Sequence, residues 1–125
     1  MTMADEKLLM VLMAVTDMAK AKAFYAEQLG WSVTQDYGQG DRHWVSLELP
    51  GGGASLTLST MHGKMKPGTM TLYLSTSNIE AAYHELKAKD VKVNEVKDDL
   101  YGPGSGVKWF DLRDPDGNRW LVVQS

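Results

Sequence analysis

Two stretches of this chain share one layout of strand, turn and strand. In residues 108–123, apolar and polar side chains alternate on both sides of an Asp-Pro-Asp-Gly-Asn turn, which predicts an antiparallel hairpin. Residues 43–58 repeat this pattern around a Pro-Gly-Gly-Gly turn, and Trp44 stands in register with Trp109. A duplicated hairpin of this kind favours a fold built from two copies of one unit.

The first half of the chain predicts a strand, a helix and three further strands. The apolar run Leu8–Val15 is short and continuous, so it predicts a strand buried on both faces. Asp17 can cap a helix whose apolar positions recur at three and four, and Gly30 is typical of the residue that ends one. The expected elements are a helix from Met18 to Leu29, strands at 31–36, 43–49 and 55–59, and a loop at 37–41.

The second half repeats this order after a polar connector at 61–68. The expected elements are a strand at 69–75, a helix from Ile79 to about Lys89 capped by Asn78, a strand at 91–96, a Gly/Pro loop at 98–106 and the closing hairpin. Asp90 occupies the place that Gly30 has in the first half, and we expect a local cost because Asp adopts the left-handed conformation less readily. The prediction is one domain, 1–125, with module one at about 8–60 and module two at about 69–125.

The composition argues against several classes of protein. A net charge of −3 without a cluster of Lys and Arg is not typical of a nucleic-acid-binding protein. The chain has no cysteine, which excludes disulfides and thiolate metal sites and fits the reducing cytoplasm. Its N-terminal stretch is acidic where a signal peptide would be basic, and the run 8–15 is too short to span a membrane. We expect a cytoplasmic protein with no membrane or nucleic-acid partner.

Three short motifs at these places resemble the vicinal oxygen chelate superfamily, which includes glyoxalase I, extradiol dioxygenases, fosfomycin-resistance enzymes and bleomycin-binding proteins. The motifs are Phe24-Tyr25, Leu29-Gly30 and the Asp-Pro-Asp-Gly-Asn turn at 114–118. The resemblance implies an α+β fold of two βαβββ modules, each a curled mixed sheet with a concave cavity face and helices on its outer face. It also implies a homodimer. Because this fold carries many chemistries, the resemblance does not fix an activity.

Residue alternation assigns two faces to the predicted sheets. One parity is apolar and should face the helices: Leu47, Leu56, Leu58, Met70, Leu72, Leu74, Phe110, Leu112, Trp120 and Val122. The other parity carries hydroxyls, charges and two indoles, so it is either a solvated face or a ligand cavity, and the large rings favour a cavity. The candidate ligand-binding residues on this face are Met10, Leu12, Trp44, Ser46, Thr57, Ser59, Thr71, Tyr73, Trp109, Asp111, Arg113 and Leu121.

The resemblance also implies where a divalent metal would bind, because metal-dependent members carry ligands on the first and last strand of each module. The matching positions here are Met10, Thr57, Thr71 and Leu121, and these side chains are poor ligands for such ions. The histidines fall on different predicted elements, without a spacing that places two imidazoles on one face: His43, His62 and His84. We therefore expect no metal and no cofactor.

These patterns favour a metal-free protein that binds and sequesters a small planar or aromatic molecule. Trp44 and Trp109 would stack on it, and hydroxyls such as those of Ser46 and Thr57 would orient it. The alternative is a lyase, isomerase or dioxygenase-type enzyme of the same superfamily. It would use a divalent metal at other positions, or a general base, for which the candidate catalytic residues are Glu48 and Asp111. Arg113 and Arg119 are available to pair with these acids.

Overall fold

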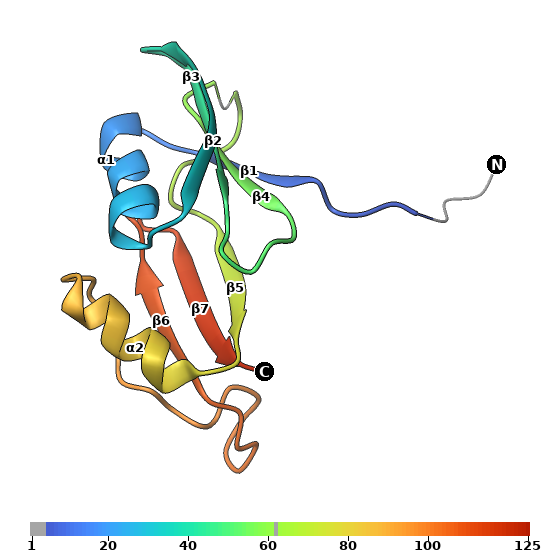
Figure 1. Cartoon of the computed structure of the whole chain (residues 1–125), viewed down its shortest axis with the longest axis vertical. Helices are drawn as coiled ribbons and strands as arrows, with labels where there is room; N and C mark the ends of the chain where they lie inside the picture. Colours follow the sequence, from blue (N-terminus) through green and yellow to red (C-terminus); the bar gives the residue numbers. More distant parts are fainter. Residues whose placement is uncertain (1–4, 62) are drawn as a thin grey trace. The chain divides into compact units, whose positions relative to one another are not determined.

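A computed structural model describes residues 5–61 and 63–125 (Figure 1). The chain contacts divide into two compact units, which we call unit 1, residues 1–66, and unit 2, residues 67–125. The division lies within the stretch 61–68. Each unit is an α+β structure with its own mixed sheet, as the sequence predicts, and each is described by itself below.

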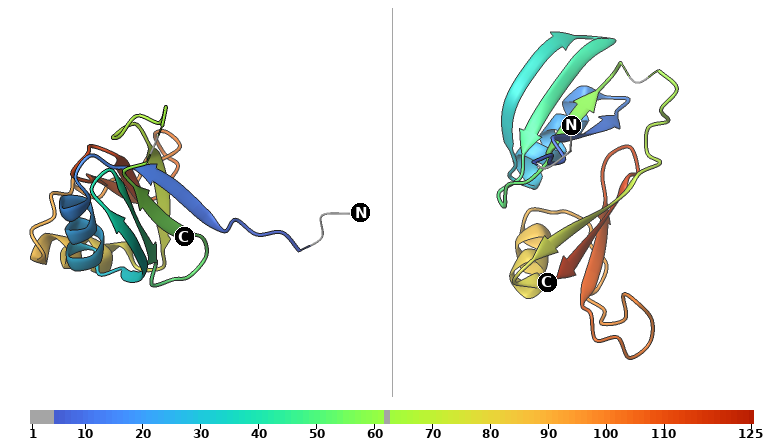
Figure 2. Two further views of the ribbon diagram at one scale, coloured as in Figure 1. Left: turned by 90° about the horizontal axis from the view of Figure 1, so that it is seen from above. Right: turned by 90° about the vertical axis from the view of Figure 1, so that its right-hand side faces the viewer.

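In residues 5–61, unit 1 contains a four-stranded sheet with the order β1-β4-β3-β2. The strands are β1 (Met10–Ala14), β2 (Ser32–Gln39), β3 (Arg42–Glu48) and β4 (Ser55–Ser59). β1 runs parallel to β4, and the other neighbouring pairs are antiparallel. The helical segment packs on one side of this sheet (Figures 1 and 2). The opposite side carries the candidate ligand-binding residues of this unit.

The helical segment begins as predicted but ends differently. The Asp17 carboxylate accepts the Lys20 backbone N–H at 3.1 Å and caps α1 (Met18–Lys22). The predicted α-helix to Leu29 is wrong in its second part, because a π-helix, η1 (Ala23–Gln28), follows, and the Leu29 N–H donates to the Phe24 carbonyl at 2.9 Å. This wider turn buries two successive aromatic residues, Phe24 and Tyr25. Gly30 then ends the segment with φ of 77°, as expected.

Two strand predictions in unit 1 need correction. The run 8–15 is not buried on both faces, since Leu8, Leu9 and Leu12 are 71%, 76% and 42% exposed. The reason is that β1 is an edge strand whose only described sheet neighbour is β4. The loop predicted at 37–41 is instead largely strand, because β2 continues to Gln39 and pairs with β3. Gly38, at φ of 80°, permits this, since a Cβ there would collide with the carbonyl oxygen of Arg42.

In residues 67–125, unit 2 contains a three-stranded sheet with the order β5-β7-β6. The elements are β5 (Thr71–Thr76), α2 (Ile79–Ala88), β6 (Trp109–Arg113) and β7 (Arg119–Gln124). The Asn78 carboxamide oxygen accepts the Ala81 N–H at 3.1 Å and caps α2 as predicted. Asp90 follows with φ of 62°, the left-handed conformation expected at this position.

The strand predicted at 91–96 is wrong, so this sheet lacks the expected fourth strand within the described residues of the unit. Only isolated bridges join the segment to β6, at Val93–Leu112 and Lys97–Trp109. Between them, the Asn94 side-chain oxygen accepts the backbone N–H of Asp111. In a regular sheet the Asp111 N–H would donate to a backbone carbonyl of the neighbouring strand. Here it donates to the Asn94 side chain instead, and regular strand pairing is interrupted at this point.

The turn between β6 and β7 is built around one buried carboxylate. Asp114 Oδ1 accepts the backbone N–H groups of Asp116 and Asn118 at 3.0 and 2.8 Å, and Oδ2 accepts the Asn118 amide at 2.8 Å. The Asn118 side-chain oxygen in turn accepts the Met70 N–H at 3.0 Å, which ties the turn to the residue before β5. Gly117 supplies the positive φ of 97°.

The pairing registers of the two sheets correspond. Trp44 pairs with Ser59 of β4, and Trp109 pairs with Val123 of β7. The apolar parity forms the core as predicted: Leu47, Leu56, Leu58, Phe110, Leu112, Trp120 and Val122 are at most 4% exposed. Met70, Leu72 and Leu74 are half-buried. In residues 5–61 and 63–125, no helix is long and apolar enough to cross a bilayer.

Candidate ligand-binding faces

The face of the unit 1 sheet opposite the helix carries a buried row of hydroxyls. Strand pairing sets Leu12 beside Thr57, and Thr57 beside Ser46. Thr57 is fully buried and Ser46 is 5% exposed, and their hydroxyl oxygens lie 2.9 Å apart. The Thr57 hydroxyl donates to the sulfur of Met10 at 3.3 Å. Either hydroxyl can be the donor in this contact, and each hydroxyl oxygen can also accept a hydrogen bond. Ser59, on the same face, is 3% exposed, and its hydroxyl accepts the Met61 N–H at 3.0 Å.

An aromatic pair lies on the same face, next to these hydroxyls. Trp44 of β3 is half-buried, and Tyr37 of β2 pairs with it across the hairpin. The ring centroids are 5.9 Å apart and the planes are tilted by 32°. Tyr37 is 56% exposed, so the pair presents aromatic surface to a ligand. Sequence reasoning missed Tyr37 because it assigned that residue to a loop. The signal that could have found it was strand alternation, which continues through Tyr37 and Gly38 to the end of β2.

The corresponding face of unit 2 is more charged. The Arg119 Nε–H donates to Asp111 Oδ2 at 2.7 Å, and the guanidinium carbon lies 5.8 Å from the centroid of Trp109. Lys97 Nζ lies 5.6 Å from the same centroid, and the indole N–H of Trp109 donates to Asp99 at 3.0 Å. Trp109 is half-buried, and two cations contact its ring.

The remaining predicted residues of unit 2 differ in exposure. Thr71 and Tyr73 lie on the edge strand β5 and are exposed, Tyr73 by 63%, whereas Leu121 on the central strand β7 is 3% exposed. Arg113 donates through Nη1 to the Gly117 carbonyl at 3.0 Å. The expected pairing of an arginine with Asp111 is thus confirmed for Arg119, whereas Arg113 contacts the turn.

The two candidate general bases have different surroundings. Asp111 accepts the Arg119 hydrogen bond at one carboxylate oxygen, Oδ2, at 2.7 Å. Glu48 is exposed at the end of β3, where it pairs in register with Ser32. Asp111 is half-buried, whereas Glu48 is exposed to solvent.

The four positions at which the resemblance implies metal ligands carry side chains that are poor ligands for a divalent cation. The Thr57 hydroxyl donates to the thioether of Met10, and Leu121 has no side-chain donor atom. Met10 and Thr71 occupy equivalent places in the registers of β1 with β4 and of β5 with β7. Among the residues that the structure describes, no three His, Cys, Asp or Glu side chains come together.

The two histidines that the structure describes, His43 and His84, lie away from these faces. His43 Nε2 is 2.6 Å from Asp36 Oδ1, and the other oxygen of Asp36 is 2.6 Å from Lys22 of α1. His43 therefore lies on the helix side of the sheet, as its parity predicts. His84 is exposed on α2, and His62 is outside the described residues. The hydrogen bond from Lys22, and then that from His43, lowers the pKa of Asp36 below its usual value.

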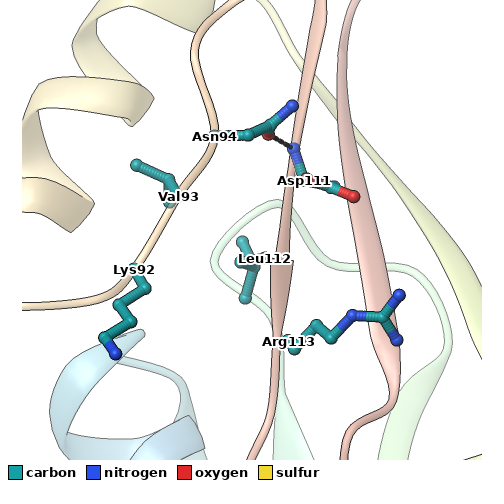
Figure 3. A pocket seen from close by; sticks show the side chains of 6 residues that line it. All are labelled: Lys92, Val93, Asn94, Asp111, Leu112 and Arg113. Atoms are coloured by element: carbon teal, nitrogen blue, oxygen red, sulfur yellow. Dashed lines mark hydrogen bonds between the residues drawn. The ribbon is translucent and has the colours of Figure 1, made fainter.

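Pockets indent both units, and the one in unit 2 shares Asp111 and Arg113 with the candidate face. One of about 350 Å³ lies along β6 in unit 2, where regular pairing with 91–97 is interrupted. Its lining residues are Lys92, Val93, Asn94, Asp111, Leu112 and Arg113, and Figure 3 shows the side chains of Lys92 and Arg113 pointing in different directions. The other, of about 420 Å³ in unit 1, is lined by Val15, Thr16, Gly40, Asp41 and Thr60. Neither gathers the aromatic residues that the sequence singles out.

Solved structures with similar folds include one protein that is described as antibiotic binding. An antibiotic binding protein, TnmS3, from Streptomyces sp. CB03234 is 28% identical, with 98% of each chain covered and a TM-score of 0.79. A glyoxalase/bleomycin resistance protein from the same organism is also 28% identical, with 95% of this chain and 100% of that chain covered and a TM-score of 0.76. A superfamily member from Sphaerobacter thermophilus DSM 20745 is 23% identical, covers 97% and 98% of the two chains, and has a TM-score of 0.79, which shows the shared fold.

A family model gives the assignment. Among curated protein sequences, none matches the chain significantly. The model described as Glyoxalase/Bleomycin resistance protein/Dioxygenase superfamily, however, matches residues 7–122, nearly the whole chain. Together with the paired α+β units and their matching registers, this match shows that the chain belongs to the glyoxalase/bleomycin resistance protein/dioxygenase superfamily.

Proposed function

We propose that this protein binds and sequesters a small planar or aromatic organic molecule without changing it chemically. The observation that carries the proposal is the Trp44–Tyr37 pair, which lies beside buried hydroxyls on the sheet face opposite the helix. A flat ligand can stack on such rings, and the hydroxyls of Ser46 and Thr57 can orient it through hydrogen bonds. Trp109 is the equivalent aromatic residue of unit 2.

The similarity to TnmS3, described as an antibiotic binding protein, supports this choice. Its 28% identity covers almost the whole of both chains, so the likeness is not limited to one motif. The donor set at Met10, Thr57, Thr71 and Leu121 also favours binding, because it does not suit the metal on which several family chemistries depend. We place this binding in the reducing cytoplasm, which a chain without cysteine suits.

A fluorescence titration tests the proposal. N-Phenyl-1-naphthylamine, a neutral and largely planar aromatic molecule, should bind saturably to the native chain and quench tryptophan emission. Trp44→Ala should weaken binding about fivefold or more, since a lost stacking contact is worth about 0.5–1.5 kcal/mol beyond area burial. Trp44→Phe keeps an aromatic ring at this position, so its affinity for the probe should fall less than that of Trp44→Ala. Circular dichroism must show both variants folded.

Two results would count against the proposal. One is a native chain that does not bind the probe or other neutral planar aromatics at concentrations up to their solubility. The other is a Trp44→Ala variant that is folded and binds as tightly as the native chain. Recovery of a chemically altered probe would instead favour the enzymatic alternative.

We also propose that two copies of the chain associate as a homodimer. The edge strand β1 and the residues before it expose the apolar side chains of Leu8, Leu9 and Leu12. An exposed apolar strand edge needs cover, and a symmetric copy is the commonest cover in homo-oligomers. Sedimentation at micromolar concentration should give twice the chain mass of 13.8 kDa. Leu9→Glu should shift the equilibrium to the monomer, and a native chain that sediments as a monomer would contradict the proposal.

A further inference from the structure

The hydroxyl-bearing face of unit 2 differs from that of unit 1 in its charge. We propose that this face recognises the anionic group, a carboxylate or sulfonate, of an aromatic ligand, and that Arg119 is the residue that binds it. This inference rests on the proposed function, because it names the chemical class of the small molecule. It adds that the protein prefers planar acids to their neutral analogues.

Arg119 is held in place from two sides. Its Nε–H donates to Asp111 Oδ2 at 2.7 Å, and its guanidinium carbon lies 5.8 Å from the centroid of Trp109. These contacts of the described residues engage one N–H of the guanidinium and leave the four on its two terminal nitrogens for a ligand. A guanidinium fixed in this way can meet a planar anion with two parallel hydrogen bonds.

The charges around Trp109 favour an anion. Lys97 and Arg119 both lie within 6 Å of the ring centroid, although their like charges repel one another. Arg113 shares the face, and Asp111 and Asp99 are the carboxylates that contact this cluster. Two cations and two carboxylates contact Trp109 or Arg119 among the described residues, and Arg113, which pairs in register with Arg119, adds a third cation, in a chain whose net charge is −3. This local excess of positive charge is what an acidic ligand would neutralise.

The sheet register sets apolar and aromatic side chains beside the guanidinium, of which Leu121 is buried and Tyr73 is exposed. On the central strand β7, Arg119 is followed on the same face by Leu121 and then Val123. Leu121 pairs with Tyr73 of β5 on one side and with Asp111 of β6 on the other. Tyr73 is 63% exposed, so its ring is accessible. A cation next to a row of apolar and aromatic side chains is the arrangement that suits a molecule with an acidic group on an aromatic body.

Two matched probes test the inference. 8-Anilino-1-naphthalenesulfonate has the ring system of N-phenyl-1-naphthylamine plus one sulfonate, so the pair isolates the charge. Arg119→Gln should weaken binding of the sulfonate about fivefold or more and change binding of the neutral probe less than twofold. Lys87→Gln, on α2, makes the same change in net charge and should leave both affinities unchanged. Added salt should weaken binding of the sulfonate and leave binding of the neutral probe unchanged.

A second variant separates recognition from a structural role of Arg119. Asp111→Asn removes a carboxylate but leaves the guanidinium, so the sulfonate should bind as tightly as before or more tightly. If Arg119 acted only through its ion pair with Asp111, both variants would weaken the sulfonate alike, and that result would overturn the inference. Equal losses for both probes in Arg119→Gln would also overturn it while leaving the proposed function intact. If neither probe binds the native chain, the proposed function fails and this inference fails with it.

Discussion

The buried carboxylate of Asp114 offers a direct test of what holds unit 2 together. Asp114 is 6% exposed and accepts three hydrogen bonds, two of them from Asn118, which is fully buried. Asp114→Ala leaves the backbone N–H and the side-chain amide of Asn118 without their acceptor in a place that water does not reach. Each buried donor left unpaired costs about 1–3 kcal/mol.

The two buried donors together predict a loss of about 2–6 kcal/mol in the free energy of unfolding. This is a large share of the roughly 5–15 kcal/mol by which a domain of this kind is stable. The loss should extend beyond the turn, because Asn118 also accepts the Met70 N–H at 3.0 Å next to β5. Asp114→Asn keeps one acceptor oxygen but sets an amide against the Asn118 amide, so it should lose less, about 1–2 kcal/mol.

Urea unfolding, followed by circular dichroism and tryptophan emission, measures these losses. Asp116→Ala is a suitable control because this half-buried residue is in the same turn, and its backbone N–H remains to donate to Asp114. The reasoning is refuted if Asp114→Ala costs less than about 0.5 kcal/mol, which is the usual range of surface substitutions. It is also refuted if Asp114→Ala costs no more than Asp116→Ala.

Three further predictions concern strain, pH and metal. Asp90→Gly should stabilise the protein by about 0.5–1 kcal/mol, because glycine adopts the left-handed φ of 62° without strain. Gly30→Asp should destabilise the protein by a similar amount, and thermal unfolding of each variant measures the change. Because the folded state lowers the pKa of Asp36, its contribution to stability is complete above about pH 4 and is lost as pH falls through the lowered value. The melting temperature of the native chain should therefore exceed that of Asp36→Asn at pH 6, with the difference vanishing in acid, and a constant difference would contradict this. Protein purified without chelator should contain far less than one equivalent of Zn, Ni, Fe or Mn by elemental analysis, and one tightly bound equivalent would contradict the reading of the ligand positions.

Features that depend on local chemistry could be predicted from the sequence. Asp17 and Asn78 cap their helices as expected, because a side-chain acceptor before a helix satisfies backbone donors only two or three residues away. Alternation separated the buried residues of the closing hairpin from those of the hydroxyl face, since the period of a strand is set by its own backbone. Asp90 adopts the left-handed conformation that its place after α2 requires.

Features that depend on contacts between distant residues could not be predicted from the sequence. The extension of β2 depends on how closely Gly38 approaches Arg42, and the missing fourth strand of unit 2 depends on where the side chain of Asn94 points. The same holds for the candidate site, where the chemistry of Trp44 and Trp109 differs despite their equivalent registers. Tyr37 lies beside the first and Arg119 beside the second, and both neighbours come from another strand.

The four indole N–H groups allow the central claim to be tested in one measurement. A ¹⁵N-labelled sample gives a separate NMR signal for each tryptophan, and single Trp→Phe variants assign them. Titration with N-phenyl-1-naphthylamine should shift the signals of Trp44 and Trp109, the half-buried indoles of the hydroxyl-bearing faces. Trp31 and Trp120 are 7% and 3% exposed in the core, and their signals should remain in place. Shifts confined to Trp31 and Trp120, or four signals that do not move at saturating probe, would contradict the binding of planar molecules at these faces.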